Sequence, residues 1–276
     1  MLHAITFDFW GTLYQNTHAR DERLHLLEET LTRHSQPRPR AALEAAYSHA
    51  WSTWERVWRE EHHSITTKRW LREILAVLEV DLPEDALDSL RRPIEEIYLH
   101  GDTPRPVPGV AEVLPRLSNR YRLGLISDTG LTPGRVLRKV LRRDGLLPYF
   151  HTLTFSDETG ATKHLPEQFL RTLATLEVQP EHAAHVGDLP ETDLAGARAA
   201  GMRAVLFLGV THRQDGRPLA DAVFEEYGEL EELLEKLDGT DWKDSEPTPN
   251  TVSNTASAGP KASHIENRQS THREAR

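Results

Sequence analysis

FDFWGTL, residues 7–13, ends an apolar run that begins at Ala4. The run AITFDF (4–9) is apolar apart from one threonine and one carboxylate, Asp8, and such a run is typical of a strand buried in a parallel sheet. Trp10 follows Asp8 by two positions, and a Gly-Thr pair comes next. In open parallel sheets, ligands bind beyond the carboxyl ends of the strands. Asp8 is therefore a candidate functional residue.

Further short apolar runs alternate with amphipathic helical patterns across residues 104–237. The runs are YRLGLIS (121–127), HTLTF (151–155), AAHVG (183–187) and RAVLFL (203–208). Buried runs that alternate with helices indicate a parallel sheet covered on both faces. We therefore predict an α/β fold with a doubly wound parallel sheet, to which AITFDF contributes one more strand.

The block between the first strand and the rest of the sheet has helical patterns only. They cover roughly 17–34, 40–62, 67–80 and 84–99, with breaks at QPRP, HHSITT and DLP. We predict a sheet domain from 1–15 and 104–237 and an inserted all-helical domain from 16–103. The stretch 238–276 is rich in Ser, Thr, Asn and Pro without apolar periodicity, and this composition predicts a disordered tail.

Composition narrows the class of protein. The 276 residues carry a formal net charge of -10 and contain no cysteine. The absence of cysteine excludes disulfides, thiolate zinc sites and cysteine nucleophiles, and it fits a cytoplasmic location. The acidic balance argues against a nucleic-acid partner, and no apolar stretch reaches the ~20 residues of a membrane span. We expect no leader peptide, no membrane partner, a small-molecule substrate, and a monomer or homodimer.

Polar residues follow several predicted strands. Ser127 ends YRLGLIS, Lys163 lies beyond HTLTF, and Asp188 follows AAHVG, with Asp193 five residues later. Together with Asp8 they place three carboxylates, a hydroxyl and an ammonium at one edge of the sheet. Grouped carboxylates repel each other unless a divalent cation binds, and ligands that are all oxygen suit Mg²⁺. A carboxylate nucleophile beside a cation and a lysine indicates phosphoryl transfer.

With these motifs in order, the chain resembles the haloacid dehalogenase-like (HAD) hydrolase superfamily. Its four motifs are represented by FDFWGTL, LISDTG (125–130), GATKHLPEQF (160–169) and HVGDLPETDLAGARAAGM (185–202), and the resemblance covers nearly all of 1–237. It implies a Rossmann-like fold, and the helical insert is similar to the C1-type cap of that family. It also implies a magnesium-dependent hydrolase, most simply a phosphatase of a small phosphorylated metabolite that works through an aspartyl-phosphate.

The resemblance also implies roles for single residues. Asp8 would be the nucleophile and a metal ligand, the main-chain carbonyl of Trp10 a second ligand, and Asp188 and Asp193 the remaining metal ligands. Ser127 and Lys163 would hold phosphoryl oxygens, and Thr12 would orient the Asp8 loop. Each of these roles is an expectation that the family resemblance implies.

The chain departs from the family pattern at three positions. Trp10 stands where family phosphatases usually carry a second aspartate that handles the leaving-group proton, Asp128 replaces a common Asn, and His164 replaces a common Pro. Two alternatives follow from Trp10. One is a dehalogenase, in which Asp8 attacks a carbon that bears halogen. The other is a non-catalytic binding or scaffold protein.

Residues outside the motifs receive structural interpretations. Trp51, Trp54 and Trp58 lie on one helical stripe, which favours a place in the core of the insert. The alternative is that some aromatic residues of the insert face the active site and shape substrate choice. Arg20 and Arg23 lie at the entrance of the insert, where they could bind a substrate anion, but a solvated helix face is the favoured interpretation. The fifteen histidines show no ligand spacing and are interpreted as surface residues.

Overall fold

The sheet of this protein is built from six parallel strands. The computed structural model describes residues 1–100 and 103–239. The strands are β1 (Ala4–Phe7), β2 (Arg122–Ser127), β3 (Thr152–Phe155), β4 (Ala183–Gly187), β5 (Arg203–Phe207) and β6 (Ala222–Phe224). Their order is β3-β2-β1-β4-β5-β6, and every neighbouring pair is parallel. The predicted doubly wound α/β fold is confirmed, and β6 is an addition that the sequence patterns did not indicate.

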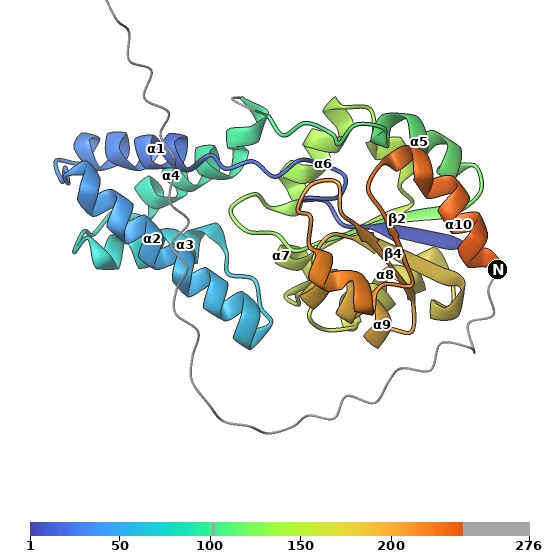
Figure 1. The fold of residues 1–276 in the computed structure, drawn as a ribbon. Helices are drawn as coiled ribbons and strands as arrows, with labels where there is room; N and C mark the ends of the chain where they lie inside the picture. The colour runs from blue at the N-terminus through green and yellow to red at the C-terminus, as the bar shows by residue number, and fades with distance from the viewer. Residues whose placement is uncertain (101–102, 240–276) are drawn as a thin grey trace, which may run out of the picture. The chain divides into compact units, whose positions relative to one another are not determined.

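Helices cover both faces of the sheet because successive strand residues point to opposite sides. Ile5 and Phe7 join a buried cluster with α5 (Val110–Ser118), α6 (Gly134–Arg143) and α10 (Leu230–Asp238). Ala4 points the other way and packs with α8 (Glu167–Leu176) and α9 (Ala195–Ala199). The short helix α7 (Ser156–Thr159) follows β3. The ribbon in Figure 1 shows these helices around β2 and β4.

The segment between β1 and α5 is helical, as predicted. It consists of α1 (Arg20–Arg33), α2 (Arg40–Arg56), α3 (Thr67–Val77) and α4 (Glu84–Glu96). The predicted second helix is shorter than expected, because α2 ends at Arg56 and passes into a π-helical turn, Val57–Glu61, which stops at the left-handed backbone of His62. Helices α1–α4 enclose a hydrophobic cluster of their own, which runs from Leu24 to Ile94 and includes Leu131 from the loop after β2.

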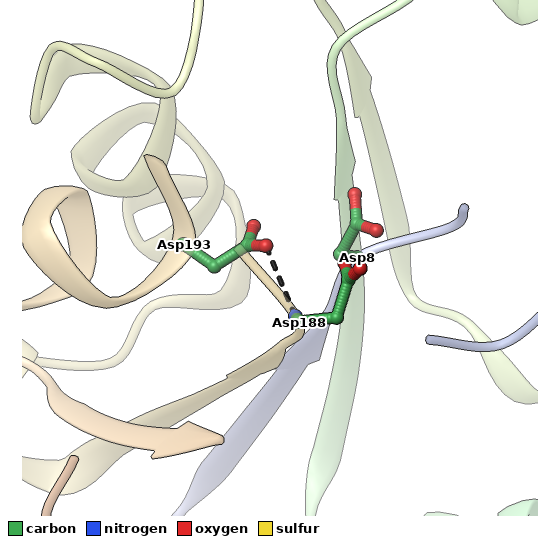
Figure 2. Close-up of side chains that lie close together, drawn as sticks. All are labelled: Asp8, Asp188 and Asp193. Carbon is green, nitrogen blue, oxygen red and sulfur yellow. Dashed lines mark hydrogen bonds between the residues drawn. The ribbon is translucent and has the colours of Figure 1, made fainter. Parts of the chain in front are cut away.

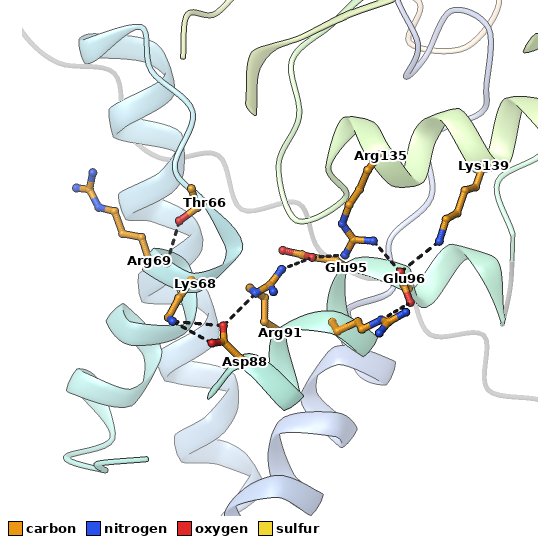
Figure 3. A network of polar contacts seen from close by, with 10 residues as sticks. Thr66, Lys68, Arg69, Asp88, Arg91, Glu95, Glu96, Arg135 and Lys139 are labelled. Atoms are coloured by element: carbon orange, nitrogen blue, oxygen red, sulfur yellow. Dashed lines mark hydrogen bonds and ion pairs between the residues drawn. The ribbon is translucent and has the colours of Figure 1, made fainter. Parts of the chain in front are cut away.

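An ion-pair network connects the C-terminal end of α4 to α6 (Figure 3). Arg135 of α6 donates to the carboxylates of Glu95 and Glu96, at 2.6 Å to Glu96 Oε1, and Lys139 lies 3.4 Å from the same oxygen. Arg91 donates to Glu95 from within α4 at 2.8 Å. The two glutamates are nearly buried, so the arginines supply the charge that burial of a carboxylate requires.

The C-terminal end of the described chain differs slightly from the prediction. Helix α10 includes Asp238, which the sequence pattern places in the tail. The predicted disorder of the remaining tail lies outside the described residues. Among residues 1–100 and 103–239, no helix combines the length and the apolar composition that a membrane crossing requires.

Candidate active site

Three carboxylates meet where the order of the strands reverses. Asp8 follows β1 and Asp188 follows β4, and these two strands are neighbours, with Phe7 paired to Val186. From β1 the chain adds β2 and β3 on one side, then β4 to β6 on the other, so both aspartates lie at the topological switch point. Asp193 joins them, and one oxygen from each of the three lies within 4.8 Å of the others. Figure 2 shows the three side chains converging.

Two glycines allow this close approach. Gly11 has φ of 72°, and a Cβ there would lie 2.4 Å from Asp188 Oδ2. A Cβ at Gly187 would lie 2.3 Å from Cβ of Asp193. Any larger residue at either position would push a carboxylate out of place, so the glycine of FDFWGTL has a steric reason in this fold.

Asp193 is the best-anchored carboxylate of the three. It lies in a π-helical turn, Pro190–Leu194, that follows β4. Its Oδ2 accepts the main-chain N–H of Asp188 at 3.2 Å and of Leu189 at 2.9 Å. The dashed line in Figure 2 marks the first of these bonds. The side chain therefore holds the loop that presents Asp188.

Lys163 is the cation of the cluster. Its Nζ donates to the carboxylate of Asp8 and, at 2.5 Å, to Oδ1 of Asp193. The lysine and the three aspartates are each no more than 5% exposed. One ammonium thus faces three buried carboxylates, and this excess of negative charge is what a divalent cation would neutralise.

The pKa values follow from this crowding. Burial raises the pKa of Asp8 to about 7, although Lys163 lowers it. Burial also raises the pKa of Asp188, with the charges of Asp8 and Asp193 acting in the same direction. Burial opposes ionisation of Asp193 too, but Lys163 and His185 hold the pKa of that carboxyl below its usual range. Asp193 is thus the ionised partner of Lys163, whereas Asp8 and Asp188 need a further positive charge to ionise fully near neutral pH.

His185 corrects the prediction that the histidines are surface residues. It is fully buried in β4, its Nε2 lies 3.2 Å from Asp193 Oδ1, and its Nδ1 lies 2.8 Å from Thr6 Oγ1. Burial lowers its pKa, so the ring is neutral and one N–H can donate to Asp193. The sequence does carry a signal, because His185 lies in the middle of AAHVG, a run that itself predicts a buried strand.

The remaining predicted site residues are Thr12, Trp10 and Ser127, and each has contacts of its own. Thr12 Oγ1 donates to Asp188 Oδ1 at 3.4 Å, and Tyr227 donates to the Thr12 carbonyl at 3.0 Å. Trp10 lies near the Tyr98 ring, with 5.6 Å between ring centroids. Ser127 is fully buried, and its hydroxyl donates to the main-chain carbonyl of Asp128 at 3.4 Å. No hydrogen bond joins Ser127 to the three aspartates within the described residues.

Asp128 connects the sheet edge to the helical insert. Its carboxylate accepts the main-chain N–H of Lys163 at 3.0 Å and the indole N–H of Trp58 at 2.8 Å. The aspartate at this position therefore positions the backbone that carries Lys163, and it does so while bonded to the insert. His164 lies against Trp58 as well, with ring centroids 4.5 Å apart.

A cavity of about 370 Å³ opens beside Asp8 and Lys163. Its walls include Trp10, Trp51, Trp54, Trp58 and Tyr98. The prediction that the three tryptophans of α2 and its continuation form the core of the insert is confirmed only in part, because Trp54 packs against the buried cluster of the insert while all three line the cavity. Helical spacing places them on one stripe, but this stripe faces the cavity, and Trp51 remains 39% exposed.

Arg23 also lines this cavity, and its burial corrects the favoured interpretation of a solvated residue. The sequence indicates a solvated helix face, yet Arg23 is only 6% exposed, whereas Arg20 is exposed as expected. The Arg23 guanidinium donates to Thr132 Oγ1 at 3.3 Å and lies over the Tyr98 ring, 5.4 Å from its centroid. Charge spacing alone could not reveal this, because the wall that covers α1 comes from the loop after β2.

Comparisons with known proteins agree with this architecture. A family model described as haloacid dehalogenase-like hydrolase matches residues 2–201. Glyceraldehyde 3-phosphate phosphatase of Pyrococcus furiosus is 34% identical over 141 residues, which is 50% of this chain and 58% of that relative. The aligned part is thus less than two thirds of the relative's length.

Solved structures match over more of the chain. The crystal structure of a 2-haloacid dehalogenase from Pseudomonas syringae pv. Tomato DC3000 has a TM-score of 0.65 at 27% identity and covers 86% of this chain and 100% of that one. A HAD phosphatase from Thermococcus onnurineus has a TM-score of 0.56 at 25% identity, covering 84% of this chain and 98% of that one. Both share the parallel α/β fold.

Proposed function

The chain belongs to the haloacid dehalogenase-like hydrolases, and on that premise we propose that it is a magnesium-dependent phosphatase of small phosphorylated molecules. The observation that carries the proposal is the buried cluster of Asp8, Asp188 and Asp193 around the Lys163 ammonium at the switch point of the sheet. A buried acid with a perturbed pKa beside a cavity is a physical mark of a reactive site.

We propose that the protein has two domains, because its buried apolar side chains form separate clusters in the sheet region and in the helical insert. Residues 1–15 and 104–237 form the catalytic domain, and 16–103 form a cap of the C1 type. The support is that helices α1–α4 bury a cluster of their own, while the sheet is covered by two others. In this view the cap supplies walls of the substrate cavity, and the edge of the sheet supplies the chemistry.

The donor set fits Mg²⁺. Carboxylate oxygens of Asp8, Asp188 and Asp193, with the carbonyl of Trp10, would hold the ion, and all are hard oxygen ligands. The negative charge that remains after Lys163 is counted gives the site a reason to bind a cation. Bound there, Mg²⁺ supplies electrostatic stabilisation of the transferring phosphoryl group.

The residues then act in two steps. In the first, an Oδ of Asp8 forms a bond to phosphorus while the ester P–O bond breaks, and the electron pair leaves on the ester oxygen. In the second, water cleaves the acyl phosphate, which releases inorganic phosphate and restores Asp8. Lys163 and Ser127 bind phosphoryl oxygens, and Thr12 supports the loop through Asp188.

Trp10 determines which leaving groups are favoured. Its side chain lines the cavity but cannot give a proton to a departing alkoxide. Positioned acid–base catalysis contributes ~10²–10⁴-fold, so its absence penalises alkyl esters more than aryl or acyl phosphates, whose oxygens leave without protonation. We therefore propose aryl or acyl phosphates as the better substrates, and slow hydrolysis of the intermediate.

A 2-haloacid dehalogenase is the second candidate, because Trp10 removes the usual acid and a solved dehalogenase has a similar fold at 27% identity. In that reaction Asp8 would displace halide from carbon, and no metal is needed. The cluster of three carboxylates favours the phosphatase, since a bound divalent cation would relieve the repulsion among Asp8, Asp188 and Asp193.

One screen separates the two functions. Paired phosphate esters and 2-haloacids are incubated with and without Mg²⁺, and released phosphate and halide are measured. The proposal predicts phosphate release that requires both Mg²⁺ and Asp8. Halide release that persists in EDTA would establish the dehalogenase. Turnover of neither class, with no metal binding, would favour the scaffold alternative.

A further inference from the structure

Arg23 has the surroundings of a ligand-binding cation. It is only 6% exposed, and its Nε–H is buried without a hydrogen-bond partner among the described residues. The ion pairs found within those residues include none between Arg23 and a carboxylate. Thr132 and the Tyr98 ring hold the group in place but leave its charge uncompensated. A buried guanidinium without a counter-charge is costly unless a ligand supplies one.

Its location connects Arg23 to the reacting group. Arg23 lines the cavity that Asp8 and Lys163 also line. It borders a second cavity of about 350 Å³, which shares His18 and Trp51 with the first. A molecule whose phosphoryl group sits at Asp8 thus has room to extend toward Arg23, along walls formed by aromatic rings.

Lys163 also lines this cavity, but it is not available to bind a second anionic group of the substrate. It is paired with Asp8 and Asp193, and the mechanism already assigns it to the phosphoryl group. The acids on the wall are engaged as well: Asp128 accepts two hydrogen bonds, and Glu55 is paired with Arg59. Among the described residues that line the cavity, the uncompensated positive charge therefore lies at Arg23.

We propose that Arg23 binds an anionic group, a carboxylate or a second phosphate, on the leaving group of the substrate. The inference rests on the proposed phosphatase function and adds the substrate class to it. The planar fork of the guanidinium matches the geometry of either anion, and Thr132 fixes one end of that fork. The aromatic walls accommodate the body between the two anionic ends.

The test uses matched substrates with the full-length, magnesium-loaded protein. Phenyl phosphates that carry a carboxylate at position 3 or 4 are compared with the carboxamides of the same shape, and a phosphonate series represents the second phosphate. Breaking a buried charge-assisted pair costs about 2 kcal/mol or more, so the wild type should favour an anionic member by about 30-fold or more in kcat/KM.

Variants assign this preference to Arg23. Arg23→Gln should reduce the ratio of carboxylate to carboxamide to about 1, while Arg23→Lys should keep part of it. Arg33→Gln is the matched control, because it removes the same charge from an exposed position of the same helix that lines neither cavity, and it should keep the full ratio. A merely structural Arg23 would change kcat/KM for both members alike and leave the ratio untouched.

The outcomes are distinguishable. Equal kcat/KM for anionic and neutral members in the wild type overturns the inference without harming the phosphatase. If no member is hydrolysed, the proposed function has failed, and titration with 4-hydroxybenzoate and 4-hydroxybenzamide decides the binding question. Tighter binding of the benzoate, lost in Arg23→Gln, supports Arg23 as the anion site, and equal binding overturns it.

Discussion

The main cavity has one wall at the edge of the sheet and another on the helical insert, and the side chains of these walls are positioned in different ways. At the edge of the sheet, Asp8 and Asp188 extend from paired strands, and Gly11 leaves no room for another arrangement. On the insert side, Trp51 and Trp54 project into the cavity from one helix. Helical spacing alone does not determine whether such a stripe faces a cavity or the core of the insert. The catalytic residues are thus positioned by the register of the strands, whereas the residues that would select the substrate are positioned by the direction in which a helix face is turned.

The largest expected effect lies on the sheet side. Asp8→Asn removes the nucleophile without changing the shape of the site, so kcat/KM for phosphate esters should fall by about 10⁴-fold or more, as expected when the attacking group is lost. Asp21→Asn is the control, since Asp21 is an exposed carboxylate of α1. Steady-state kinetics with released phosphate as the signal measures both. Residual activity within tenfold of the wild type would remove Asp8 from the mechanism.

Trp10 follows Asp8 and packs against Tyr98, so it lies where the two walls of the cavity meet. Trp10→Asp supplies the missing proton donor, so hydrolysis of alkyl phosphates should rise by about 10²-fold, while aryl phosphates change little. The paired kcat/KM values are measured in the wild type and the variant, with Trp10→Leu to control for loss of the ring. If the wild type already cleaves both classes equally, another residue is the acid.

Metal binding should belong to the sheet side alone. Mg²⁺ at a hundredfold excess over its dissociation constant should stabilise the fold by ~2.7 kcal/mol, visible as a higher melting temperature. Asp188→Asn should diminish this shift, and Trp54→Leu should leave it unchanged. A melting temperature that millimolar Mg²⁺ does not move would argue against the site.

The pH dependence of this stabilisation has a definite sign. Because burial raises the pKa of Asp8 to about 7, the metal-free protein holds a proton there at pH 6 that the unfolded chain does not. This proton stabilises the fold at low pH, and the stabilisation is lost as the pH rises through about 7. Above that pH, Mg²⁺ binds without displacing a proton from Asp8. The Mg²⁺-induced rise in melting temperature should therefore be larger at pH 8 than at pH 6. An equal or smaller shift at pH 8 would contradict the assignment.

The smallest effect is expected on the insert side. Trp54→Leu shortens one aromatic wall, and ring stacking contributes about 0.5–1.5 kcal/mol, so KM for aryl phosphates should rise by up to about tenfold. The value of kcat should stay within about twofold, since the indole N–H of Trp54 has no hydrogen-bond partner among the described residues and so does not hold a catalytic carboxylate. A fall in kcat with unchanged KM would show that the wall takes part in the chemistry.

The same difference explains what the sequence can predict. Asp8, Lys163, Asp188 and Asp193 are identifiable because each follows a strand, and parallel strands bring their carboxyl ends to one edge. The inward position of Arg23 is not predictable, because periodicity gives the stripe of a helix and not the element that covers it. The burial of His185 is missed for another reason. The scattered spacing of the histidines suggests surface positions, although the strand that contains His185 is expected to be buried.

The central claim is that Asp8 becomes phosphorylated. Borohydride reduces an aspartyl phosphate to homoserine, so protein mixed with 4-nitrophenyl phosphate and Mg²⁺ is quenched, reduced and mapped by peptide mass spectrometry. Since Trp10 leaves the second step without a base, the intermediate should accumulate. We expect homoserine at position 8 in the wild type and none in Asp8→Asn. Phosphate release at full rate without this product, or with the modification at another residue, would contradict it.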